Sequence, residues 1–227
     1  MKARNTFFSR MDPNQLAVCL EADSLGYSPT IWQLVRHLYY ADGAERDYGE
    51  AFRWLNTLVR SDACPPRAFL LLGECYYNGY GTVVDYVAAV RTLLRSMEYS
   101  GLDKWGMANS EIYRCECSWW KTARGVLGPS DIRRTRFLLG ECYYYGKGVL
   151  KDYCKALRYL TLSVQEDEYL YPNKDAELLI GESYYYHRGT KQNTPAAIRW
   201  ITLASEHGSA EARAFLHKRT MNNVKPG

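Results

Sequence analysis

The chain has 227 residues, of which 47% are hydrophobic and 24% are charged, so it can bury a continuous core and remain in solution. Its formal net charge is only +4, and both signs of charge are scattered along the sequence. Nucleic-acid binding requires a basic stripe, and a membrane span requires a run of about 18 apolar residues, so we expect neither.

The N-terminal stretch reads MKARNTFFSRMDPN, in which Phe7 and Phe8 are the apolar pair. It contains no apolar stretch of about 7–15 residues typical of a secretory signal, and we therefore expect a cytoplasmic protein. Asp12 and Pro13 form a helix-start signal, because Asp caps the first backbone N–H groups and Pro fits the first helical position. They predict a helix that caps the N-terminal end of the fold.

One string of ten residues recurs along the chain. LGECYYNGYG begins at Leu72, LGECYYYGKG at Leu139 and IGESYYYHRG at Ile180, and a weaker copy begins at Leu34. We number each copy from this leading residue, so that position +5 lies five residues after it. Such self-similarity predicts stacked units, each of which buries too little apolar surface to be stable alone.

Each copy predicts two helices joined by a glycine turn. Apolar residues spaced four apart, such as Leu139 and Tyr143, give the first helix one buried stripe. Glycine at +1 lets a second helix come close, and the glycines at +7 and +9 end the first helix in a left-handed turn. The Asp or Asn at +13 is placed to cap the second helix, whose inward face carries Ala at +17.

This pattern resembles the Sel-one-like repeat, a longer relative of the tetratricopeptide repeat. The third copy matches the motif of that family at Leu139, Gly140, Tyr143, Gly146, Gly148, Asp152, Ala156 and Tyr159. The first copy departs from it, with Val35 in place of the Gly and Leu38 in place of the Tyr. The resemblance implies an all-α fold, an α-solenoid of stacked antiparallel helix pairs that binds proteins or peptides, usually without catalysis.

We expect a single solenoid domain over residues 1–227, with a capping helix at each end and one inserted helix. The spacing between the second and third copies is longer than the others, which places the insert between them. The predicted segments are an N-terminal cap (12–27), repeat 1 (28–64), repeat 2 (65–101), the insert (102–129), repeat 3 (130–171), repeat 4 (172–208) and a C-terminal cap (209–220). The insert is either a degenerate repeat that packs against its neighbours or an extension of the binding surface.

The cysteines, histidines and glycine motifs of the sequence predict no cofactor, metal or catalytic site. Seven cysteines are an odd number, and Cys75 and Cys142 share position +3 beside the core, so we expect buried, unbridged thiols. Cys115 and Cys117 lack a second Cys or His pair at zinc spacing. The four histidines stand beside no nucleophile motif, and no phosphate-binding glycine loop is present.

By analogy with tetratricopeptide geometry, the exposed, partner-facing positions of the first helices are −5, −2, +2, +5 and +6. The predicted partner-binding residues are Trp32, Arg36, Tyr39, Tyr40, Arg67, Glu74, Tyr77, Asn78, Arg134, Phe137, Glu141, Tyr144, Tyr145, Asp175, Glu182, Tyr185, Tyr186 and, on the cap, Lys218. Leu70 and Leu178 fall on the same −2 position. The glutamates at +2 and the tyrosines at +5 either contact a partner or brace adjacent repeats, whereas the tyrosines at +4 are predicted to be core.

The resemblance implies a non-enzymatic protein–protein interaction module. Short members of the family resemble bacterial binders that neutralise a toxin or effector in the cytosol, as immunity proteins do, and we expect this function. A regulatory scaffold or adaptor for a signalling or secretion complex is the alternative. A hydrolase acting on cell-wall-derived or β-lactam substrates, as some secreted relatives imply, is a more remote one.

Overall fold

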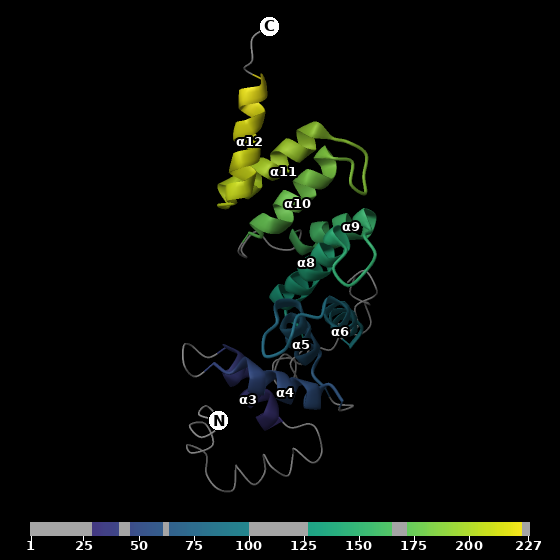
Figure 1. The fold of residues 1–227 in the computed structure, drawn as a ribbon, viewed down its shortest axis with the longest axis vertical. Helices are drawn as coiled ribbons and strands as arrows, with labels where there is room; N and C mark the ends of the chain where they lie inside the picture. The colour runs from purple at the N-terminus through teal and green to yellow at the C-terminus, as the bar shows by residue number, and fades with distance from the viewer. Residues whose placement is uncertain (1–28, 41–45, 61–63, 100–126, 165–171, 224–227) are drawn as a thin grey trace, which may run out of the picture. The chain divides into compact units, whose positions relative to one another are not determined.

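The computed structural model describes residues 29–40, 46–60, 64–99, 127–164 and 172–223 (Figure 1). Every regular element in these ranges is an α-helix, which confirms the predicted all-α fold class. The helices are α3 (Pro29–Tyr40), α4 (Tyr48–Leu58), α5 (Pro66–Asn78), α6 (Tyr86–Tyr99), α8 (Pro129–Tyr145), α9 (Tyr153–Val164), α10 (Lys174–Tyr185), α11 (Thr194–Glu206) and α12 (Ala210–Asn223). The predicted N-terminal cap and inserted helix lie outside the described residues.

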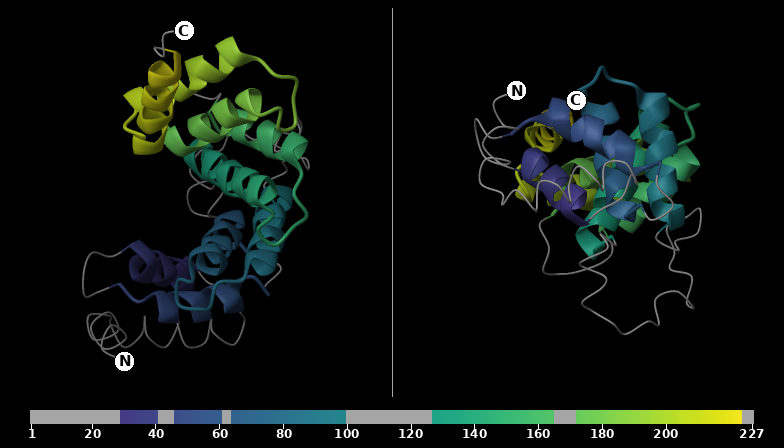
Figure 2. Two further views of the ribbon diagram at one scale, coloured as in Figure 1. Left: turned by 45° about the horizontal axis from the view of Figure 1, so that its top comes forward. Right: turned by 90° about the horizontal axis from the view of Figure 1, so that it is seen from below.

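The chain divides into two compact units, Met1–Leu127 and Gly128–Gly227. Their boundary falls inside the predicted insert, so the first unit carries repeats 1 and 2 and the second carries repeats 3 and 4 with α12 as the C-terminal cap. Within each unit every helix packs against the next one along the chain (Figure 2). That the whole chain forms one solenoid domain stays a prediction.

In the second, third and fourth repeats the two helices approach closely because the +1 residue is glycine, whereas the first repeat has Val35 there. A Cβ atom on Gly140 would lie 2.8 Å from Leu160 Cγ, and one on Gly181 would lie 2.5 Å from Ile201 Cγ1. The alanine at +17 of the facing helix is fully buried in all four repeats, as at Ala156. These small residues confirm the predicted close helix pair, since a larger side chain at either position would force the helices apart.

A second set of contacts closes the turn between the helices. In all four repeats the +13 backbone N–H donates to the +4 carbonyl, at 2.9–3.1 Å. The +13 side chain caps the second helix by accepting from the +16 N–H, at 2.9–3.0 Å. In the third repeat this residue is Asp152, and the bond from the Lys155 N–H lowers the pKa of its carboxyl group. The predicted N-cap is therefore confirmed.

The fourth repeat departs from the pattern at the end of its first helix. Gly79 and Gly146 end α5 and α8 at +7 with φ of 75° and 76°, as predicted, but His187 stands there with φ of 58°. The left-handed region costs a residue with a side chain about 1–2 kcal/mol, and the freedom of glycine in the unfolded chain offsets part of this. We expect His187→Gly to raise the free energy of unfolding by about 0.5–1 kcal/mol in urea denaturation. An unchanged or lower stability would mean that the His187 side chain itself contributes.

Four cysteines lie in the described ranges, and all four are free thiols. Cys75 and Cys142 are fully buried, as predicted, and burial raises the pKa of each to about 12. Cys64 is also buried with its pKa raised to about 12, whereas Cys154 is exposed. The prediction of unbridged thiols is confirmed for these four and stays a prediction for the other three.

Candidate protein-binding surface

The structure divides the predicted partner-binding residues by exposure. The buried ones are Trp32, Tyr39, Phe137 and Tyr144, together with Leu70 and Leu178. The partly buried ones are Arg67, Glu74, Tyr77, Glu141, Glu182 and Tyr185. The exposed ones are Arg36, Tyr40, Asn78, Arg134, Tyr145, Asp175, Tyr186 and Lys218. The predicted surface is therefore partly a packing surface.

The prediction that position −2 is exposed was wrong. Trp32 lies in an apolar cluster that also contains Leu55 of α4 and Leu72 of α5. Leu178 packs in the cluster that contains Ala204 of α11 and Ala212 of α12. The −2 side chain is thus covered by the neighbouring helices, and this large apolar area belongs to the core.

Position +5 was also wrongly placed on the surface in two repeats. The exposed fraction is 6% for Tyr39 and 3% for Tyr144. Each phenol reaches the next repeat: Tyr39 Oη donates to Glu74 Oε2 at 2.7 Å, and Tyr144 Oη donates to Glu182 Oε2 at 2.6 Å. Burial and then the adjacent glutamate raise the pKa of both tyrosines. For these residues the structure supports bracing between repeats, the second of the two interpretations that the sequence left open.

In the second unit an arginine completes this brace. Arg188, at +8 of the fourth repeat, lies over the rings of Tyr144 and Tyr153, at 5.3 and 5.7 Å from the guanidinium carbon. It also donates a hydrogen bond to Tyr144 Oη and forms an ion pair with Glu182 at 3.4 Å. The third and fourth repeats are therefore joined by a cation, a carboxylate and two phenol rings.

In the first unit a tyrosine fills the same slot. Tyr80, at +8 of the second repeat, stacks on Tyr48 with ring centroids 4.4 Å apart and meets Tyr39 edge-on at 6.4 Å. We did not predict a role for position +8 or for position +14, which holds Tyr48 and Tyr153. The recurrence of tyrosine at +14 in three of the four repeats was the available signal. The +8 residue thus contacts the preceding repeat in both units, through an arginine in the second unit and a tyrosine in the first.

Position +6 carries the exposed aromatic residues of the first helices. Tyr40, Tyr145 and Tyr186 are 48%, 47% and 48% exposed. Each ring meets the +5 tyrosine before it edge-on, at 5.0, 5.0 and 4.9 Å between centroids. A cation lies over each exposed ring: Arg67 at 5.9 Å, Lys147 at 5.2 Å and Arg188 at 5.0 Å. We call these three residues the +6 tyrosines.

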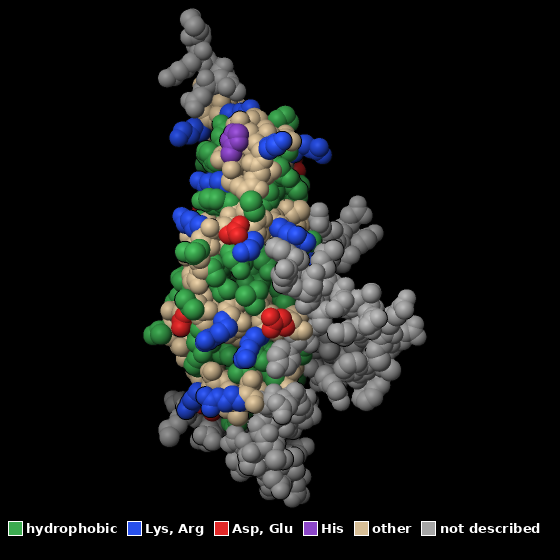
Figure 3. Space-filling model, turned by 90° about the vertical axis from the view of Figure 1, so that its right-hand side faces the viewer, with side chains coloured by type: hydrophobic (Ala, Val, Ile, Leu, Met, Phe, Trp, Pro, Cys, Tyr) green, Lys and Arg blue, Asp and Glu red, His purple; other side chains and the backbone are tan. Residues whose placement is uncertain are grey.

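The carboxylates beside the +6 tyrosines are engaged within the chain. Glu141 forms an ion pair with Lys147 at 3.1 Å, and Glu182 pairs with Arg188 and accepts from Tyr144. On the face shown in Figure 3, the described charged side chains of both signs lie among apolar ones. The +6 surface therefore presents aromatic rings bordered by internally paired charges.

The tyrosines at +4 were predicted to be core, and the structure buries them only in part. Tyr76 meets Phe52 edge-on at 5.3 Å, and Tyr143 stacks on Tyr159 of its own repeat at 5.8 Å. Tyr76 thus packs against α4 of the preceding repeat and Tyr143 against α9 of its own, while the rest of each ring stays accessible, which suits a side chain with a polar tip. At +5, in contrast, the tyrosines of the first and third repeats are buried, and Tyr159 of α9 is buried as well.

Within the described ranges, no group of three or more His, Cys, Asp or Glu side chains gathers to hold a metal ion. Among the described helices, none has the length and apolar character that a membrane span needs.

The repeat geometry is matched by a family model. The Sel1 repeat model matches residues 36–57, 67–91, 135–167 and 174–209, just over half of the chain. The chain belongs to the Sel1 repeat family. Sel1 repeats generally mediate protein–protein interactions, and Sel1 repeat proteins are typically non-catalytic scaffolds. The predicted family and fold class are thereby confirmed.

Several solved structures are similar to this Sel1 repeat chain, including the following three. A Sel1 repeat protein from Oxalobacter formigenes is 21% identical with a TM-score of 0.40, covering 93% of this chain and 82% of its own. A Sel1 repeat protein from Klebsiella pneumoniae is 17% identical with a TM-score of 0.41, at 83% and 76% coverage. The protective antigen c5321 of uropathogenic Escherichia coli is 19% identical with a TM-score of 0.33, at 86% of this chain and 49% of its own. No curated protein matches this chain in sequence.

Proposed function

We propose that this chain is a non-enzymatic binding module that contacts a protein partner through its +6 tyrosines, and that the partner is a toxin or effector that it neutralises. The observation that supports binding is the recurrence of an exposed tyrosine at one repeat position in both units, each about half exposed. Single exposed tyrosines are common on protein surfaces, so the repetition at one position, rather than the exposure of any one ring, favours a contact surface.

Tyrosine suits this role because it offers a large contact area with few rotatable bonds, and it is enriched among the residues that dominate binding energy. The +6 rings are also held in place before binding. Tyr145 rests against Tyr144, whose hydroxyl is fixed by Glu182, and Tyr186 lies under Arg188. A preordered surface loses less side-chain entropy on association, so more of the contact energy becomes affinity.

The second unit supplies a defined patch for the partner. The bond from Tyr144 to Glu182 joins the third and fourth repeats near the ends of α8 and α10, where Tyr145 and Tyr186 follow. Lys147 and Arg188 lie over these two rings. Both cations are already paired, Lys147 with Glu141 and Arg188 with Glu182, so a partner surface with apolar or aromatic side chains would match these rings best.

The neutralising role is the finer part of the proposal. Blocking a toxin or effector requires one tight interface and no chemistry by the binder, which agrees with the non-catalytic character typical of Sel1 repeat proteins. The alternative scaffold role requires the partner to stay active while bound. The two roles therefore differ in what happens to the activity of the partner.

The experiment captures the partner on the tagged full chain, identifies it by mass spectrometry and co-expresses the two proteins. We expect the partner to damage growth when expressed alone, wild-type chain to restore growth, and Tyr145→Ala/Tyr186→Ala to lose both capture and protection. Leu150→Ala is the matched control, because Leu150 is an exposed apolar residue of the same unit, 92% exposed, that is not one of the +6 tyrosines. A bound partner that keeps its activity would support a scaffold instead.

A further inference from the structure

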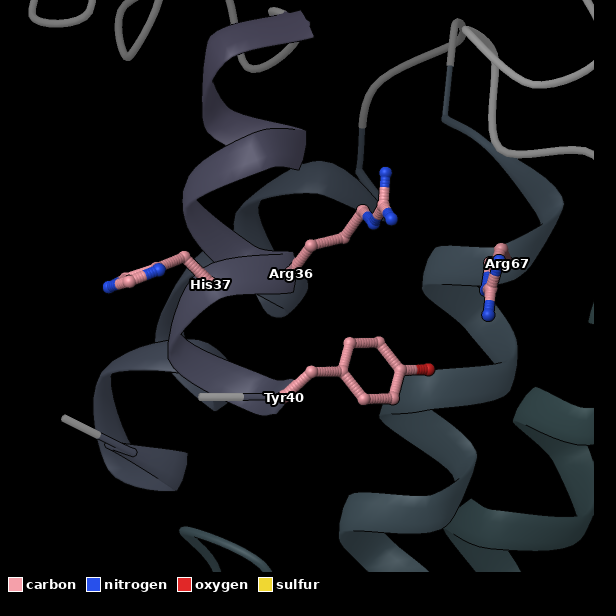
Figure 4. A pocket seen from close by; sticks show the side chains of 4 residues that line it. All are labelled: Arg36, His37, Tyr40 and Arg67. Carbon is pink, nitrogen blue, oxygen red and sulfur yellow. The ribbon is translucent and has the colours of Figure 1, made fainter. Parts of the chain in front are cut away.

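The first unit holds a pocket of about 450 Å³ between α3 and α5. Arg36, His37 and Tyr40 of α3 and Arg67 of α5 line it. In Figure 4, Arg36 and Tyr40 reach from α3 toward the side of α5 that carries Arg67, while the His37 ring points to the other side of α3. Two guanidinium groups and one phenol thus border the same space.

The repeat register explains how these residues meet. Arg36 and Tyr40 occupy +2 and +6 of the first repeat, and Arg67 occupies −5 of the second. In the other three repeats position +2 is glutamate, and in the second and fourth it accepts the bracing hydrogen bond from a tyrosine. The first repeat reverses this charge and leaves Arg36 exposed at the pocket. The site is therefore specific to the first repeat rather than a feature of every repeat.

The chemistry of the pocket favours carboxylates. A guanidinium is a rigid fork of N–H donors that binds a carboxylate with two parallel hydrogen bonds, and it stays charged at every physiological pH. Arg67 lies over the Tyr40 ring, with its guanidinium carbon 5.9 Å from the ring centroid, so the aromatic face and the cation border the same space. The four described residues that line the pocket include two arginines and no carboxylate.

We infer that this pocket binds acidic side chains of an extended segment of the protein partner. The inference rests on the proposed function, because it assumes a protein partner. The pocket volume of about 450 Å³ falls within the roughly 300–1,000 Å³ of ligand pockets and exceeds what one carboxylate group fills. A short peptide that carries glutamate or aspartate therefore matches both its size and its charge.

The test titrates the isotope-labelled full chain with N-acetylated, C-amidated Gly-Glu-Gly-Glu-Gly and follows the arginine Nε–Hε signals by NMR. The corresponding glutamine peptide, which has the same shape and no charge, is the ligand control. We expect the glutamate peptide alone to shift the Arg36 and Arg67 signals. Arg36→Gln should weaken its binding at least tenfold, since one charge-assisted pair is lost. The fold of this variant, checked by circular dichroism, should be unchanged because Arg36 is exposed.

Arg91→Gln/Arg95→Gln is the matched protein control. It removes two positive charges from α6 of the same unit, at exposed positions that do not line the pocket, and it should leave binding within about twofold. Equal binding of the two peptides, unchanged binding to Arg36→Gln, or an equal loss in the α6 variant would overturn the inference. These outcomes leave the proposed function intact, because that function is tested at Tyr145 and Tyr186 of the other unit.

Discussion

Gly189→Ala should lower the free energy of unfolding by roughly 3–5 kcal/mol, because two costs combine at this residue. Gly189 has φ of +74°, which a residue with a side chain adopts at a cost of about 1–2 kcal/mol. A Cβ atom there would also lie 2.3 Å from the carbonyl carbon and oxygen of Tyr153. These are backbone atoms at the start of α9, so a rotamer change cannot relieve the clash. Urea denaturation measures the loss.

Gly208→Ala is the matched control for this prediction. Gly208 also has a positive φ, of +91°, but a Cβ atom there meets nothing within 4 Å. It should therefore carry the conformational cost alone, and the difference between the two variants measures how tightly the glycine turn of the fourth repeat docks on the third. Gly81 is equivalent in the first unit, where a Cβ atom would lie 2.1 Å from Tyr48 O. Equal losses for Gly189→Ala and Gly208→Ala would disprove this docking role.

Tyr144→Ala should cost about 3–5 kcal/mol of stability, since truncating a buried aromatic residue leaves a cavity. Tyr144 is 3% exposed and holds Glu182 and Arg188 of the next repeat, so its loss also leaves those two groups without their phenol contact. Tyr145→Ala, one residue further along the same helix, should cost less than about 1 kcal/mol because its ring is 47% exposed. The difference in unfolding free energy between the two variants separates the contact that joins the third and fourth repeats from the exposed +6 ring.

A double-mutant cycle isolates the hydrogen bond within this brace. Tyr144→Phe removes only the hydroxyl, and Glu182→Gln removes only the charge of its acceptor. We expect a coupling free energy of about 1–3 kcal/mol between the two changes, as for contacting residues in a shared network. Additive effects would show that the bond between Tyr144 and Glu182 does not join the third and fourth repeats.

Local sequence signals were sufficient for the framework of each repeat. Repeat 3 was predicted to begin at residue 130, one residue from the observed start of α8 at Pro129, and Asp152 caps the following helix as predicted. Gly140 allows the close approach of α9 because its requirement is steric and local. Such features depend on residues within one helix pair, so the sequence of that pair determines them.

The side of the first helix that faces the next repeat could not be predicted in the same way. Tyr143 and Tyr144 are adjacent in sequence, and the tetratricopeptide analogy assigned their exposure in the wrong order. The Sel1 turn brings Arg188 of the following repeat over Tyr144, and a contact of this kind depends on how repeats stack. The equivalent contact in the first unit uses Tyr80, so no single residue type marks the position.

The most direct measurement takes affinity for the captured partner and thermal stability from the same purified variants, by calorimetry. We predict that Tyr145→Ala/Tyr186→Ala weakens binding at least tenfold, about 1.4 kcal/mol or more, while its unfolding temperature stays close to that of the wild type. Tyr144→Ala should show a lower unfolding temperature. Measured well below that temperature, its affinity for the partner should equal that of the wild type. Full affinity of Tyr145→Ala/Tyr186→Ala for the partner would contradict the claim that the +6 tyrosines form the binding surface.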